Sequence, residues 1–220
     1  MTRAALFDVD GTLTDTNHLH VTAWWEAFRQ AGHDVPMHAI HRSIGLGGED
    51  LIARLLGDDR DTAEDSAISA AHKTLYATYF DRLPAMDSAG TLLRTVAAQG
   101  WTVVLVTSAS GRELEALRRA VDADDVIART ASSDDVEDGK PAPEPVRHAL
   151  DLVGGEPERA VLVGDTVWDM KAGTRAGVSC VGLLCGGIPA DDLRAAGAGA
   201  VYADPAELLA RLAESPLAPE

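Results

Sequence analysis

The sequence predicts an α/β fold, a doubly wound and mostly parallel sheet with a Rossmann-like core and an inserted all-helical module. Three features predict it. Short apolar runs of strand length recur along the chain, and helical patterns lie between most of them. The third feature is the stretch from Asn17 to Asp81, which contains helical patterns and no convincing strand. Alternating strands and helices are typical of a parallel sheet covered on both faces.

The expected strands are apolar on both faces, as strands buried inside such a sheet should be. They occupy residues 4–9, 101–107, 159–164, 178–184 and 199–203, with a weaker candidate at 125–130. The expected helices between them occupy residues 89–99, 112–120, 144–153 and 169–176. Glycine, the usual C-terminal cap of a helix, follows three of these patterns at Gly100, Gly154 and Gly177.

The helical module follows the first strand. Its helices are expected at residues 17–32, 48–57 and 62–80. We therefore divide the chain into an α/β catalytic core, residues 1–16 and 84–220, and a helical cap of residues 17–83, which we call the insertion. The linkers between the two are expected near residues 15–17 and 83–86.

Composition and charge exclude several kinds of partner. The chain has 220 residues, 46% of them hydrophobic, and a net charge of −16, which disfavours nucleic acid and anionic membranes. No apolar run is long enough for a membrane span or a signal-peptide core. The two cysteines, Cys180 and Cys185, are expected to be buried thiols, with one disulfide as the alternative. We expect a cytoplasmic protein that is a monomer rather than an oligomer.

Polar side chains follow four of the expected strands. In order along the chain they are Asp8 and Asp10, Thr107 and Ser108, Lys140, and Asp165 and Asp169. Ligands of open α/β sheets bind beyond the carboxyl ends of the strands, where these residues should meet. Lys140 lies between Gly139 and Pro141 and is one of only three lysines, which favours a functional role.

These residue types predict phosphoryl transfer with Mg²⁺ as cofactor. Clustered carboxylates raise one another's pKa unless a cation compensates, and Mg²⁺ binds carboxylates, water and phosphate oxygens. A lysine and a small hydroxyl would bind the phosphoryl group. One aspartate can be the nucleophile, and a carboxylate two residues further on can move the proton. The expected partner is a small-molecule phosphate ester.

Four segments resemble, in order and spacing, the motifs of the haloacid dehalogenase superfamily of phosphatases. They are DVDGTLTD (8–15), VTSAS (106–110), GKPAPEP (139–145) and GDTVWDMKAG (164–173). The insertion after the first motif is similar to that of the phosphoglycolate-phosphatase-like and β-phosphoglucomutase-like branch. The resemblance implies a Mg²⁺-dependent phosphatase with an aspartyl-phosphate intermediate. Superfamily members that cleave haloalkanoates lack the aspartate found here at Asp10, which favours phosphoryl transfer over dehalogenation.

The resemblance also implies a role for each motif residue. The catalytic residues would be Asp8 as nucleophile, Asp10 as general acid/base, and Thr107 and Lys140, which would bind the phosphoryl group. The metal ligands would be Asp8, Asp10 through its backbone carbonyl, Asp165 and Asp169. Ser108 is the alternative to Thr107 as a substrate contact.

The glycine-rich loop of the insertion, RSIGLGGED (42–50), is expected to approach the substrate closely. Its substrate-binding candidates are Gly45, Gly47 and Gly48. Mutase-like relatives have an arginine where this chain has Gly48, and a lysine shortly after the second motif. Both departures favour a hydrolase, and a β-phosphoglucomutase-like phosphotransferase is the alternative, with Arg42 or Arg112 left open as a substitute. A non-enzymatic binding protein on the same fold is a third hypothesis.

Three residues near the motifs have structural alternatives. Asp15 precedes the first helix of the insertion, so an N-cap role is favoured over catalysis. His20 is expected near the hinge, and its contact with the active site is left open. Trp168 lies inside the fourth motif, where packing is favoured over substrate contact.

Overall fold

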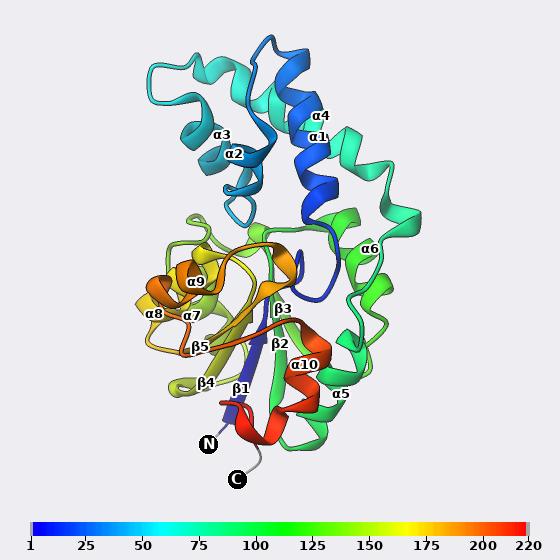
Figure 1. Ribbon diagram of the computed structural model, residues 1–220, viewed down its shortest axis with the longest axis vertical. Helices are drawn as coiled ribbons and strands as arrows, with labels where there is room; N and C mark the ends of the chain where they lie inside the picture. The colour runs from blue at the N-terminus through cyan, green and yellow to red at the C-terminus, as the bar shows by residue number, and fades with distance from the viewer. Residues whose placement is uncertain (1, 219–220) are drawn as a thin grey trace.

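The computed structural model describes residues 2–218, which form a six-stranded sheet covered by helices, with a helical module at one end (Figure 1). The strands are β1 (Thr2–Phe7), β2 (Thr102–Val106), β3 (Ile127–Ala131), β4 (Gly155–Gly164), β5 (Ser179–Leu183) and β6 (Ala200–Tyr202). All their pairings are parallel, in the order β3-β2-β1-β4-β5-β6. The predicted doubly wound α/β fold is confirmed.

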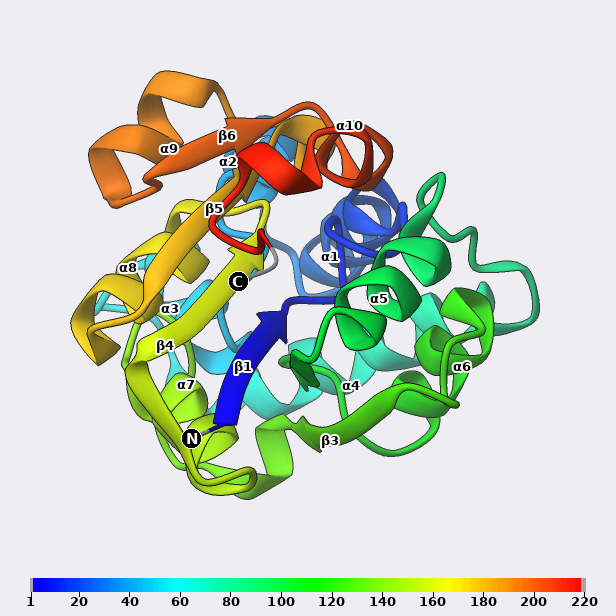
Figure 2. The same ribbon diagram turned by 90° about the horizontal axis from the view of Figure 1, so that it is seen from below.

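Helices cover both faces of the sheet (Figure 2). Those of the core are α5 (Ala89–Ala98), α6 (Gly111–Val121), α7 (Glu144–Asp151), α8 (Val167–Ala176), α9 (Ala190–Ala196) and α10 (Pro205–Ala210). Side chains of β1 alternate between two apolar clusters, because successive residues of a strand face opposite sides. Ala5 and Phe7 pack with α5, α6 and α10, whereas Ala4 and Leu6 pack with α7, α8 and α9.

The strand order creates a crevice at the carboxyl end of the sheet. The chain runs outward from β1 to β2 and β3, and then returns to the other side of β1 for β4, β5 and β6. The connections after β1 and β4 therefore diverge, and such a switch point is where open α/β sheets bind ligands. The backbone N–H of Asp8 donates to the carbonyl of Val163 (2.9 Å), which holds the loop after β1 beside the end of β4.

The insertion stands above this end of the sheet (Figure 1). Its helices are α1 (Asn17–Gln30), α2 (Met37–His41), α3 (Gly48–Leu56) and α4 (Asp65–Ala77). They share an apolar cluster that includes Trp24, Phe28 and Ile52, and Trp168 of the core packs into it. Packing is therefore the role of Trp168, as expected. The division at residues 16/17 and 83/84 stays a prediction.

Two backbone segments connect the insertion to the core, and they run side by side. Thr14 and Ala85 form an antiparallel bridge. The N–H of Asp15 donates to the carbonyl of Pro84 (3.0 Å), and the N–H of Met86 donates to the carbonyl of Leu13 (2.9 Å). We call this paired segment the stem.

The stem overturns one expectation. Asp15 was expected to cap α1, but Thr16 occupies the N-cap position and Asp15 is exposed. The physical reason is the pairing of the Asp15 backbone with Pro84, which places Asp15 in the stem, one residue too early to cap the helix.

Other differences concern short elements. The helix expected at residues 62–80 is a 3₁₀ turn at Thr62–Glu64, then α4, then a second 3₁₀ turn at Phe80–Arg82. Both cysteines are free thiols, so the disulfide alternative is wrong. Within residues 2–218, no helix combines the length and the apolar character that crossing a membrane requires.

Candidate active site

A buried lysine lies between two aspartates at the carboxyl end of the sheet. Lys140 is 2% exposed, and its Nζ donates to Asp8 Oδ1 (2.5 Å) and to the carbonyl of Val106 (2.8 Å). The same nitrogen lies 2.7 Å from Asp169 Oδ1. A buried ammonium is stable only when anionic partners compensate its lost hydration, and these carboxylates raise the pKa of Lys140 despite its burial. Lys140 therefore stays charged and holds Asp8 in a fixed position.

The residues after β4 are fixed by the start of α8. Asp169 forms a reciprocal capping box with Thr166, in which Asp169 Oδ2 accepts from the Thr166 hydroxyl (2.5 Å) and backbone N–H (3.1 Å). Asp165 accepts from Thr12 Oγ1 at Oδ1 and from Asn17 Nδ2 at Oδ2, each at 2.8 Å. Hydrogen bonds to neighbouring side chains and backbone therefore fix the orientation of both carboxylates.

Asp8, Asp165 and Asp169 fit a divalent cation. All three are buried, and each offers a carboxylate oxygen that lies within 4.8 Å of the other two. Burial raises the pKa of Asp8 to about 7 against the opposing charge of Lys140, and it raises the pKa of Asp165 well above its usual value. One lysine cannot balance three carboxylates, whereas a hard cation with oxygen ligands can.

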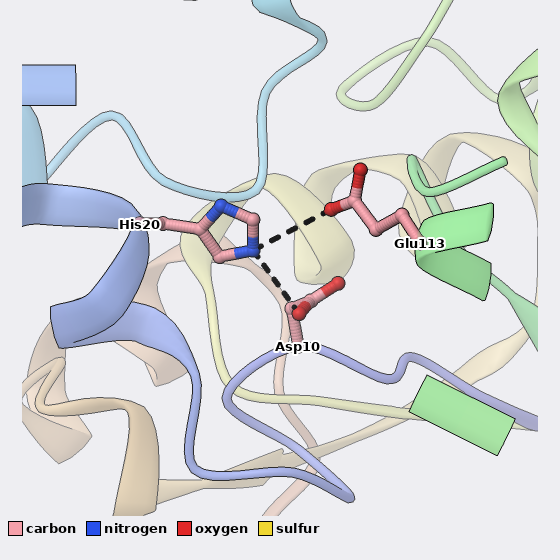
Figure 3. A group of neighbouring side chains, drawn as sticks. All are labelled: Asp10, His20 and Glu113. Carbon is pink, nitrogen blue, oxygen red and sulfur yellow. Dashed lines mark hydrogen bonds and ion pairs between the residues drawn. The ribbon is translucent and has the colours of Figure 1, made fainter. Parts of the chain in front are cut away.

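A second group surrounds Asp10 (Figure 3). Asp10 Oδ1 accepts from Thr16 Oγ1 (2.6 Å) and lies 3.2 Å from His20 Nε2. Glu113 Oε1 is 3.8 Å from the same nitrogen, and His20 Nδ1 lies 3.2 Å from His72 Nε2. Burial acts to raise the pKa of Asp10, but His20 and Thr16 outweigh it and the pKa is lowered. The open question about His20 is thereby answered, because it contacts Asp10.

Sequence reasoning missed several of these neighbours. Glu113 precedes the buried Ala116 and Leu117 by three and four positions, so it lies on the inward face of α6. On α4, His72 lies one helical turn after Ile68 and one helical turn before Tyr76, and all three residues are buried. Helical periodicity around the polar residues of α4 and α6 was the signal that could have found them.

A cavity of about 490 Å³ joins the core to the insertion. Its lining includes the expected residues Asp8, Asp10, Thr107, Ser108, Lys140, Gly45, Gly47 and Gly48. The Thr107 hydroxyl oxygen accepts from the N–H of Ala109 (3.0 Å), which leaves its O–H directed to other acceptors. Gly45 has φ +97°, and a Cβ there would lie 2.9 Å from Thr166, so the glycine lets this loop approach the core.

Arg42 does not reach this cavity. It pairs instead with Asp192 of the core, with the guanidinium nitrogen 2.8 Å from the carboxylate. Its neighbour His41 lies 2.9 Å, through Nε2, from the carbonyl of Gly186, next to Asp165. Both contacts join the C-terminal end of α2 to the core, and both residues lie outside the lining of the cavity.

Comparison with known proteins decides the family. The chain matches the haloacid dehalogenase-like hydrolases over residues 2–177. It belongs to this family. A phosphoglycolate phosphatase of Nitrosospira multiformis is 30% identical over 81% of the chain and 82% of its own length. The haloacid dehalogenase superfamily suggested by the sequence motifs is thereby confirmed, as is the predicted enzyme class, a phosphoric monoester hydrolase.

Solved structures agree with this assignment. A hydrolase from Pseudomonas syringae superposes on this protein with a TM-score of 0.91 at 32% identity, and the match covers 97% of this chain and 99% of the hydrolase. A β-phosphoglucomutase from Clostridium difficile gives a TM-score of 0.82 at 19% identity, covering 94% and 93%. At that identity the second likeness establishes the fold alone.

Proposed function

We propose that the protein is a Mg²⁺-dependent phosphatase that hydrolyses a small phosphomonoester through an aspartyl-phosphate on Asp8. The observation that carries the proposal is the buried Lys140, which bridges Asp8 and Asp169 at the edge of a cavity large enough for a small ester. A nucleophilic carboxylate, a fixed cation and adjacent acidic ligands are what in-line phosphoryl transfer requires.

Asp8, Asp165 and the backbone carbonyl of Asp10 would hold the metal, with Asp169 in support. When bound, Mg²⁺ would neutralise the carboxylates and draw charge from the phosphoryl oxygens. Lys140, held at the carboxyl end of β2 by the Val106 carbonyl, balances negative charge on the phosphoryl group, and the Thr107 hydroxyl donates to one of the phosphoryl oxygens. These contacts hold the phosphorus in line with the attacking oxygen of Asp8.

The reaction then needs two displacements. A carboxylate oxygen of Asp8 attacks phosphorus, the ester P–O bond breaks, and Asp10 transfers its proton to the departing alkoxide. Asp10 then removes a proton from water, whose oxygen attacks the aspartyl-phosphate and releases phosphate and free Asp8. A bound phosphoryl dianion beside Asp10 raises the pKa of this carboxyl, which favours the protonated form needed for the first step.

The test is Asp8→Asn with the exposed Asp15→Asn as the matched control. With Mg²⁺, the first variant should lose at least about a thousandfold in turnover of p-nitrophenyl phosphate, and the second should keep wild-type activity. Chelation of the metal should abolish wild-type turnover. Near-normal activity of Asp8→Asn would remove the nucleophile assignment, and full activity in chelator would remove the metal.

The phosphotransferase alternative has less support. A bisphosphate intermediate needs a cation for its second phosphate, but Gly48 offers none and Arg42 is paired with Asp192. Incubation with β-glucose 1-phosphate separates the two activities: free phosphate supports the hydrolase, and glucose 6-phosphate supports the mutase.

A further inference from the structure

The cavity has an acidic wall beside Asp10. An alcohol that leaves in line from Asp8 must receive its proton from Asp10, so its oxygen lies next to that carboxyl. Glu113, contributed by α6, places a carboxylate oxygen within 4.8 Å of Asp10 and points to the same space (Figure 3). The side chain of Glu113 is 20% exposed, so water screens its charge only in part. A leaving group would therefore contact Glu113.

The mouth of the cavity carries more negative charge. Glu49 and Asp50 at the start of α3 line it from the insertion, and Glu137 and Asp138 line it from the core. Burial and then the charges of Asp138 and Glu49 raise the pKa of Asp50, so the negative charges of the two parts act on one another in this lining. These residues are exposed, so their effect on a ligand is weaker than that of Glu113.

Cations that could balance a second anion are scarce among the described residues that line the cavity. Lys140 is held by Asp8 and Asp169, and no arginine is present in the lining. Lys73 is exposed, so water screens its charge more strongly than that of the partly buried Glu113. Against the effect of burial, Asp10 and Glu113 raise the pKa of His20, whose positive charge faces these two carboxylates. Burial lowers the pKa of His72 well below its usual value, so His72 is neutral.

We infer that the cavity selects phosphate monoesters whose alcohol donates hydrogen bonds and carries no second anionic group, and that Glu113 determines this specificity. The inference rests on the proposed phosphatase function. Carboxylates accept hydrogen bonds from hydroxyl or ammonium groups, and they repel a carboxylate or a second phosphate at the same place. A cavity of about 490 Å³ accommodates a polyol or amino-alcohol.

Three esters of similar size test the inference with Mg²⁺ at about pH 8.5, because burial raises the pKa of Glu113 to about 7 and the alkaline pH keeps it ionised. Glycerol 3-phosphate has a neutral alcohol, phosphoethanolamine a cationic one, and 3-phosphoglycerate an anionic one. For the wild type, kcat/KM for each of the first two should exceed that for 3-phosphoglycerate at least about tenfold. This is the effect of one unit charge at about 6 Å with an effective dielectric of about 40. Comparison of the first two esters reports whether hydroxyl or ammonium is preferred.

Glu113→Gln should reduce the ratio of kcat/KM for glycerol 3-phosphate to kcat/KM for 3-phosphoglycerate about fivefold to tenfold, because the substitution removes the charge and keeps the shape of the side chain. The matched control is Glu115→Gln, on the exposed face of the same helix, which should leave the ratio unchanged. A preference of the wild type for 3-phosphoglycerate overturns the inference. So does an equal loss of activity on all three esters in Glu113→Gln, which would mark a structural role. A wild type inactive on these esters and on p-nitrophenyl phosphate removes the proposed function itself, and the inference with it.

Discussion

Replacing Lys140 by methionine should cost the metal-free protein about 4 kcal/mol of unfolding free energy. The change keeps the length of the side chain and removes the cation that contacts Asp8, Asp169 and the Val106 carbonyl. Loss of one partner of a buried ion pair costs about 3–5 kcal/mol. The carboxylates of Asp8 and Asp169, whose oxygens lie within 4.8 Å of each other, repel by at least about 3.5 kcal/mol at an effective dielectric of about 20.

A carboxyl that has lost the lysine can take up a proton instead of remaining charged. Protonating an ordinary carboxyl at about pH 7 costs about 4 kcal/mol, so the destabilisation cannot exceed this cost by much. Burial raises the pKa values of Asp8 and Asp165 in the folded protein, so ionisation of these two carboxyls destabilises the folded state as pH increases above their unfolded value. The penalty of Lys140→Met should therefore be smaller at about pH 5 than at about pH 7.

Urea unfolding in chelator, followed by circular dichroism, measures the effect. Adding Asp169→Asn to Lys140→Met should recover about 1–3 kcal/mol, because the second change removes the orphaned charge. Lys171→Met, over the Trp168 ring, is the matched control and should cost less than about 1 kcal/mol. A penalty below about 1 kcal/mol for Lys140→Met, or strict additivity in the double variant, would refute the reasoning.

Three further predictions concern the same site. In Gly186→Ala the new Cβ would overlap Asp165 Oδ2, so the Mg²⁺ concentration for half-maximal activity should rise at least about tenfold. The control is Gly199→Ala, whose new Cβ would have no atom nearer than 3.7 Å and should leave that concentration unchanged. Because burial raises the pKa of Asp8 to about 7 and that of Asp165 well above its usual value, Mg²⁺ binding at about pH 6 should release at least about one proton, and fewer at about pH 9. Calorimetry in buffers of different ionisation enthalpy measures this, and a buffer-independent heat at about pH 6 would contradict it. Thr16→Val removes the hydroxyl that donates to Asp10 Oδ1 at 2.6 Å and helps lower the pKa of Asp10. The limb of the pH profile that reports Asp10 should therefore move to higher pH, and kcat/KM should fall about fivefold. A limb that does not move would count against the assigned contact.

The gathering of the motif residues was predictable because each lies beyond the carboxyl end of a parallel strand. Parallel strands bring their carboxyl ends to one edge, so Asp8, Lys140 and Asp165 had to approach one another once the strands were identified. The support of Asp165 was harder to see. Asn17 is 148 residues away in sequence, and nothing in its local pattern indicates which carboxylate it meets.

Contacts between the insertion and the core were beyond sequence reasoning for a similar reason. Arg42 could have met any of many acidic residues, and only the relative placement of α2 and the core selects Asp192. The helix α2 spans five residues, and α10 spans six, so neither offers two full turns of periodicity. Glu113 differs, because its spacing from Ala116 and Leu117 was visible in the sequence.

The stem has a consequence for how such an enzyme can change. The chain enters the stem at Leu13 and leaves it at Met86, and a single backbone hydrogen bond joins these two residues. The residues between them occupy the position that the loop of a β-hairpin occupies between its two strands. A module of another size or shape could be transplanted onto the same two positions only if it replaced Asn17 and His20, which contact Asp165 and Asp10. The joint is therefore exchangeable, whereas the contacts that the insertion makes with the aspartates of the core have to be supplied again.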